Sequence, residues 1–291
     1  LLGANALLGL DWRLTSPHVA TAIALRGALY GVCYYGTVLV LAQSRALPKL
    51  PRSFWWRSLA VLAVIALVDA LPLEQLLRPL MTHRPLRYEQ LLLRKATTLL
   101  IGLPALGLLS VLLRARGEPL LPGWGRPRAE HLHPFLWMTL GLLPFVALVS
   151  FSTGFRHSYP ILNVCSAAVP RSMTRPEALA LLEGVYLLNF VAVETLWRGA
   201  LTLWVLPSEA RYDATGEPST AALTLLLPMA VAYVALHLGK PPVEAIASLG
   251  GGWLLGVAAL RYRQLWGGAW IHLSMAAMME LFAYAQWWLR R

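Results

Sequence analysis

The chain has 291 residues, of which 57% are hydrophobic and only 13% are charged. Because soluble domains carry roughly a quarter charged residues, this composition excludes an ordinary soluble domain and indicates a membrane protein. Lysine and arginine outnumber aspartate and glutamate by 25 to 14. These basic residues lie in short loops between apolar runs, so they predict contact with lipid headgroups and not with nucleic acid.

Apolar runs long enough to cross a bilayer, about 18 to 20 residues, recur along the whole chain. Proline and glycine mark most of the joints between them, and residues 207–219 form the clearest aqueous loop. No repeat or composition shift divides the sequence. We therefore predict an all-α polytopic membrane protein, a single membrane domain over residues 1–291, with about eight transmembrane helices near residues 18–43, 55–73, 95–114, 134–153, 177–206, 220–238, 243–260 and 265–289.

Ionisable residues inside these spans are candidate functional residues, because a charge within a bilayer is costly unless it is paired or hydrated. Arg26 and Asp69, in the first two spans, are interpreted as helix-packing or interface groups without an assigned partner. The complete set of candidates is Arg26, Asp69, Glu183, Glu194, Arg198, His237, His272 and Glu280.

The fifth span contains "VAVETLWRG", residues 191–199, in which Glu194 and Arg198 are four residues apart. On a helix they are neighbours on one face, with the glutamate N-terminal to its cation, which is the favourable order. The pair has two interpretations, a structural ion pair and a carboxylate kept for chemistry. Apolar residues can replace a purely structural pair at little cost, so we favour a functional role for Glu194.

The last three spans add two histidines. His237 ends the apolar run "AVAYVALHLGK", and His272 lies within "GGAWIHLSMAAMMEL". A single buried histidine is more often a hydrogen-bonded core residue, but two histidines and a glutamate on three apolar helices predict a polar pocket suited to acid and base chemistry. Between them, Gly252 and Gly256 form a small-xxx-small pattern, which predicts close packing of two helices.

Three motifs in this order resemble the CAAX-protease and bacteriocin-processing (CPBP, or Abi) family of intramembrane endopeptidases, over about residues 176–280. That family has a glutamate pair followed by three residues and Arg-Gly, then an aromatic residue three residues ahead of a histidine, then a histidine followed four residues on by Asn or Asp. The elements here are "VETLWRG", "YVALH" with Tyr233, and "HLSMA". Val193 replaces the first glutamate, and Ala276 replaces the Asn or Asp.

The resemblance implies an endopeptidase that cleaves a membrane-associated or lipidated protein near its C-terminus. It implies Glu194 as the general base, His237 as its partner in orienting the water, and His272 as the oxyanion donor. Arg198 and Tyr233 are expected to support these groups. Glu280 lies two helical turns past His272 on nearly the same face. It has two interpretations, an interfacial glutamate near the end of the helix and a group that supplies the polar function missing at Ala276.

The resemblance also implies a hydrophobic or lipidated peptide and membrane lipids as partners, and a bacterial inner membrane as the location. We expect no metal cofactor. An alternative that stays open is a catalytic zinc site, in which Glu194, His237 and His272 bind the ion and water fills the fourth position. Two other classes of function stay open. One is a catalytically degenerate relative that binds or escorts a hydrophobic peptide, which Val193 and Ala276 favour, and the other is a transporter.

Overall fold

The computed structural model describes residues 18–44, 47–71, 73–80, 87–114, 118–127, 132–161, 170, 172–238 and 242–289. In these ranges the regular elements are helices, apart from one β-bridge between Tyr212 and Pro218. The predicted all-α fold is confirmed. The helices are α3 (Val19–Gln43), α4 (Arg52–Ala70), α5 (Leu73–Leu77), η1 (Arg78–Leu80), α6 (Arg87–Thr97), η2 (Thr98–Gly102), α7 (Leu103–Leu113), α8 (Leu132–Val149), α9 (Thr153–Ser158), α11 (Arg175–Glu194), η4 (Thr195–Trp204), α12 (Ser208–Arg211), α13 (Thr220–Ala235), α14 (Pro242–Tyr262) and α15 (Trp266–Trp288).

Five helical stretches in the described ranges are long and apolar enough to cross a membrane. Two more apolar helices, His133–Val149 and Thr220–Ala235, are shorter. Every predicted window overlaps a helix, but the predicted count of eight spans is not confirmed. The five are Val19–Gln43, Arg52–Ala70, Arg87–Leu113, Arg175–Trp204 and Val243–Tyr262.

The chain forms two compact units. The first comprises Leu1–Leu71, Leu100–Arg126 and Val193–Gly268, and the second comprises Pro72–Leu99, Pro127–Ala192 and Ala269–Arg291. The boundary falls near the end of α11 and near the start of α15. That the whole chain is a single membrane domain stays a prediction.

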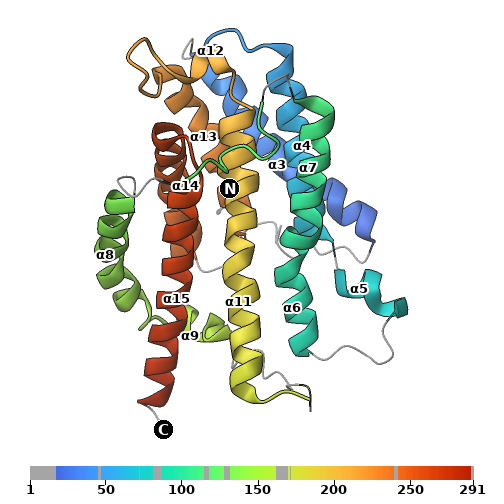
Figure 1. Cartoon of the computed structure of the whole chain (residues 1–291), viewed down its shortest axis with the longest axis vertical. Coiled ribbons are helices and arrows are strands. Elements are labelled where there is room, and N and C mark those ends of the chain that lie inside the picture. Colours follow the sequence, from blue (N-terminus) through green and yellow to red (C-terminus); the bar gives the residue numbers. More distant parts are fainter. Residues whose placement is uncertain are drawn as a thin grey trace. The chain divides into compact units, whose positions relative to one another are not determined.

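In the first unit, α3 packs against α4 and α13, and α13 packs against α14 (Figure 1). The buried side chains of α3 include Tyr30, Tyr34 and Val38. Their spacing of four residues places them on one face of a helix. That face joins a core to which α4 contributes Phe54 and Ile65. The polar groups of the candidate site lie beside this core.

The contact of α13 with α14 confirms the close packing predicted from the glycine pattern. A Cβ atom on Gly256 would lie 2.8 Å from Leu226 Cδ2 and 2.9 Å from Met229 Cε. One on Gly252 would lie 3.2 Å from Tyr233 Cδ1. The two glycines therefore let the helices approach at a distance that larger residues would prevent.

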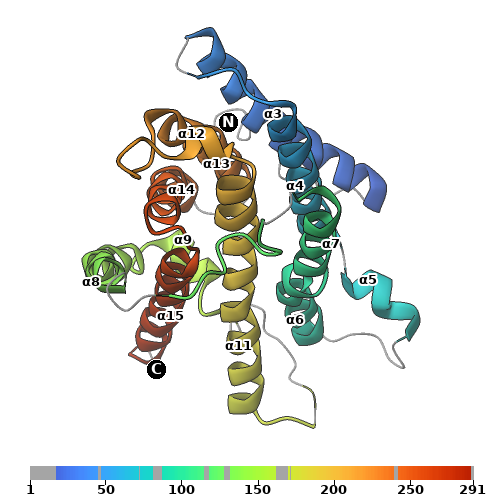
Figure 2. The same ribbon diagram turned by 45° about the horizontal axis from the view of Figure 1, so that its top comes forward.

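The second unit contains α6, α8, α9, most of α11 and most of α15 (Figure 2). Its helix α11 begins at a capping box, in which the backbone N–H of Thr174 donates to Glu177 Oε2 at 2.7 Å. The Tyr88 hydroxyl of α6 donates to the carbonyl of Ala178 at 2.8 Å. These contacts fix the start of α11 on α6.

Candidate active site

The centre of the candidate site is a buried ion pair at the point where α11 becomes η4. Glu194 Oε1 and Arg198 Nη1 are 2.9 Å apart, and neither side chain is exposed at all. The ten residues that follow Glu194 are all buried and form a π-helix, an irregularity that is frequent at functional sites. Since removing two charges from water is costly, further contacts must hold this pair.

One such contact is with Gly268, the third residue of α15. A Cβ atom on Gly268 would lie only 2.2 Å from Glu194 Oε2, so the carboxylate lies directly against the helix backbone. The first N–H groups of a helix lack partners within the helix, and this end carries a partial positive charge. The start of α15 therefore stabilises a negative carboxylate, and only glycine leaves room for it.

Arg198 also contacts the second motif, and this contact brings His237 into the same group of residues. The guanidinium of Arg198 lies 4.5 Å from the centre of the Tyr233 ring. That ring meets the His237 ring edge to face at 4.8 Å. The structure thus gathers Glu194, Arg198, Tyr233 and His237 in the first unit.

The tautomer of His237 follows from its backbone contact. Nδ1 lies 3.0 Å from the carbonyl oxygen of Tyr233, and a carbonyl oxygen only accepts. Nδ1 therefore carries the hydrogen, and in the neutral ring Nε2 carries the lone pair. This is the nitrogen that would receive a proton or orient a water molecule.

The loop 118–127 packs on the first motif, which explains the glycine of "VETLWRG". A Cβ atom on Gly199 would lie 2.4 Å from the carbonyl oxygen of Pro122. The Trp124 indole donates to Thr195 Oγ1 at 3.0 Å, and the carbonyl of Gly123 accepts from the N–H of Leu265 at 3.0 Å. Figure 2 shows the loop, in green, against the helix that contains η4.

A second ion pair lies near this site. The sequence did not predict that its two residues pair with each other. Arg26 pairs with Asp69, which also accepts a hydrogen bond of 2.7 Å from the Tyr30 hydroxyl. The Tyr30 ring packs edge-on against Trp197 at 6.1 Å, and Trp197 packs against Tyr233 at 5.1 Å. The indication of this pair in the sequence is that Arg26 and Asp69, which have opposite charges, occur in consecutive predicted spans.

The remaining predicted site residues lie in the second unit. His272 stacks on Phe190, with ring centres 5.3 Å apart. Glu280 accepts from the backbone N–H of Ile161 at 3.1 Å, and Ala276 is buried. The structure does not place the two units relative to one another. That the side chain of His272 or Glu280 approaches Glu194 therefore stays a prediction.

The expectation of no metal cofactor and its zinc alternative also stay predictions. Within the described ranges, no group of three His, Cys, Asp or Glu side chains is close enough to hold a metal ion. Two of the residues in the predicted zinc variant, Glu194 and His237, lie in the first unit, and the third, His272, lies in the second.

One protein family matches part of the chain. Residues 175–278 match the family described as type II CAAX prenyl endopeptidase Rce1-like. The chain is similar to that family over this segment. The match covers about a third of the chain and confirms the resemblance predicted from the three motifs. Comparison with curated proteins and with solved structures gives no match.

The Rce1-like segment includes Glu194, Arg198, Tyr233, His237 and His272, but not Glu280. The Arg26–Asp69 pair and the loop 118–127 lie outside it as well. The similarity to this family and the five long apolar helices in the described ranges make the chain an integral membrane protein. The family is one of peptide hydrolases.

Proposed function

We propose that this chain is an intramembrane endopeptidase that cleaves a membrane-associated or lipidated protein near its C-terminus, with Glu194 as the general base. The observation that carries the proposal is the ion pair of Glu194 and Arg198, fully buried within the segment that matches an endopeptidase family. A buried charge pair that serves only packing is readily replaced by apolar residues. Its presence in an apolar helix therefore supports a chemical role.

Hydrolysis of a peptide needs a base for water, a proton donor for the leaving amine and a stabiliser for the oxyanion. Glu194 removes a proton from water while His237 Nε2 accepts a hydrogen bond from the same water. The resulting hydroxide adds to the peptide carbonyl, and His272 donates to the oxyanion. The carbon–nitrogen bond then breaks as Glu194 returns the proton to the amine.

Arg198 and Tyr233 act as positioning residues in this scheme. Arg198 holds Glu194 Oε1 at 2.9 Å and packs on the Tyr233 ring. Tyr233 in turn holds the His237 ring through its carbonyl oxygen. One cation and one aromatic ring thereby connect the first motif to the second. Glu280 is proposed as a supporting polar group.

The surroundings of the site support the proposed substrate class. A site in apolar helices is reached by a hydrophobic or lipidated peptide, with membrane lipids as neighbours, and we place it in a bacterial inner membrane. No metal is required by this scheme. The zinc variant predicts loss of activity with a chelator and recovery with added zinc, whereas the glutamate scheme predicts an unchanged rate.

The test uses the full chain in liposomes with a farnesylated peptide that ends in a CAAX sequence. Glu194→Gln should reduce cleavage by about 10²- to 10⁴-fold, the usual contribution of a general base. The matched control is Glu217→Gln, the same substitution at an exposed glutamate of the same segment, which should cleave normally. Cleavage by a folded E194Q protein at the wild-type rate would overturn the proposal.

The same experiment separates the enzyme from an escort protein. Peptide binding is measured in parallel, by the fluorescence polarisation of a labelled peptide. An enzyme loses cleavage in E194Q and keeps binding. A wild-type protein that binds the peptide without cleaving any member of a panel of CAAX peptides would support the escort instead.

A further inference from the structure

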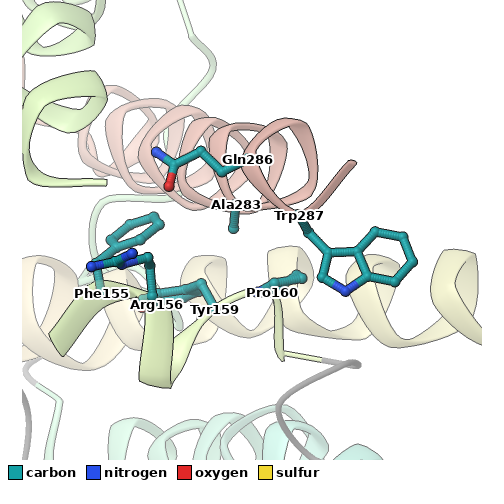
Figure 3. Close-up of a pocket in the computed structure, with 7 residues that line it drawn as sticks. All are labelled: Phe155, Arg156, Tyr159, Pro160, Ala283, Gln286 and Trp287. Atoms are coloured by element: carbon teal, nitrogen blue, oxygen red, sulfur yellow. The ribbon is translucent and has the colours of Figure 1, made fainter. Parts of the chain in front are cut away.

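A small cavity lies in the second unit between α9 and the C-terminal end of α15 (Figure 3). Its volume is about 110 Å³. Pockets for drug-sized ligands occupy about 300–1,000 Å³, so this cavity is too small for a peptide or a prenyl chain. It has room only for a small polar part of a larger molecule. The lining residues are Phe155, Arg156, Tyr159, Pro160, Ala283, Gln286 and Trp287.

The cavity presents a cation and a hydrogen-bond acceptor from opposite sides. Arg156, on α9, is exposed, and within the described ranges its guanidinium has no carboxylate partner. Gln286, on α15, donates from Nε2 to Ser150 Oγ at 2.6 Å. Its Oε1 atom is buried and has no hydrogen-bond partner among the residues that the structure describes. A ligand with an anionic group and a donor would satisfy both.

The surroundings of the cavity are typical of a membrane interface. Trp288 and Leu289, which follow the lining residue Trp287, are 77% and 85% exposed. Exposed tryptophan near the end of an apolar helix is typical of the level of lipid headgroups.

We propose that this cavity binds the headgroup of an anionic phospholipid, phosphatidylglycerol. The phosphate pairs with the Arg156 guanidinium, and a glycerol hydroxyl donates to Gln286 Oε1. Arginine suits phosphate because its planar fork donates two parallel hydrogen bonds. Phosphatidylcholine fits less well, since its choline group has no donor and cancels the negative charge. This site is independent of the proposed proteolysis.

The test is native mass spectrometry of the full chain with equal, stepwise additions of phosphatidylglycerol and phosphatidylcholine. The wild-type protein should bind phosphatidylglycerol preferentially. Arg156→Gln should reduce that binding about five- to tenfold, the value of one basic contact to an anionic headgroup. The matched control is Arg52→Gln, because Arg52 is another exposed arginine, and it should leave binding unchanged.

A second pair of variants tests the acceptor. Gln286→Leu removes Oε1 together with the bond to Ser150, whereas Ser150→Ala removes only that bond. Reduced binding in Q286L with normal binding in S150A supports the proposal. Equal binding of both lipids by the wild type, or wild-type binding by a folded R156Q protein, would overturn it. Thermal unfolding in detergent confirms that each variant is folded.

Discussion

Among the described residues of the first unit, two ion pairs have both partners on long apolar helices, and these pairs differ in burial and in their relation to the matched family segment. Glu194 and Arg198 are on one helix and are both 0% exposed. Arg26 and Asp69 join α3 to α4 and are 19% and 21% exposed. The first pair lies inside the Rce1-like segment, residues 175–278, and the second lies outside it.

The partners of the two carboxylates also differ. Asp69 accepts from the Tyr30 hydroxyl as well as from Arg26, so its contacts are those of a helix-packing group, as predicted. Glu194 lies instead against the backbone of Gly268 and shares its arginine with an aromatic ring. Full burial with a helix start and a histidine nearby supports the chemical role proposed for Glu194, whereas a side-chain network between two helices supports a role in stability.

Removing one cation from each pair gives the largest expected effect. Arg198→Met leaves a buried carboxylate without its cation and should lower the free energy of unfolding by about 3–5 kcal/mol. Arg26→Met should cost about 1–2 kcal/mol, because its pair is partly exposed and Tyr30 still donates to Asp69. Unfolding in mixed micelles of mild detergent and dodecyl sulfate measures both.

The double variants sharpen this result. Glu194→Gln combined with Arg198→Met should recover much of the stability lost in R198M, since no charge then stays buried. A double-mutant cycle gives the coupling energy of each pair. Equal coupling energies for the two pairs would contradict the distinction between them.

The sequence predicted the local part of this comparison and missed the part that depends on tertiary structure. Glu194 and Arg198 meet because a helix places residues four apart on one face, which spacing alone reveals. Arg26 and Asp69 meet because α3 lies against α4, and hydropathy does not say which faces of two helices touch. The contact of Tyr233 with Arg198 was not predicted, because no periodicity relates residues on two different helices.

The glycines show the same limit. Gly252 and Gly256 were predicted to pack because their spacing has a known meaning in membranes. Gly268 and Gly199 have no such pattern, because their neighbours, a carboxylate and the carbonyl of Pro122, come from distant parts of the chain. The loop 118–127 has only the proline and glycine content of a joint between spans, and this content does not indicate which residues the loop contacts.

Gly268→Ala tests whether the carboxylate position matters for function. The new methyl group would displace Glu194 Oε2, and overpacking of this kind costs about 1–3 kcal/mol of stability. A shift of about 1 Å in a reacting group can cost about a hundredfold in rate, so cleavage should fall far more than stability does. The control is Gly250→Ala, where a Cβ atom meets nothing within 4 Å. If the cleavage rate of G268A falls only as much as its folded fraction does, the assignment of Glu194 as the general base is contradicted.

Trp124→Phe is the smallest expected effect and tests the loop 118–127. The substitution keeps the aromatic packing but removes the indole N–H that donates to Thr195 at 3.0 Å, at a cost of about 1 kcal/mol. Thr195→Val removes the other partner, and the double variant should lose no more than the larger single one. If the loop positions Glu194 through Thr195, kcat falls in W124F while KM for the farnesylated peptide is unchanged. A loop that only covers the helix would give the same stability loss with an unchanged kcat, so the rate separates a positioning role from packing.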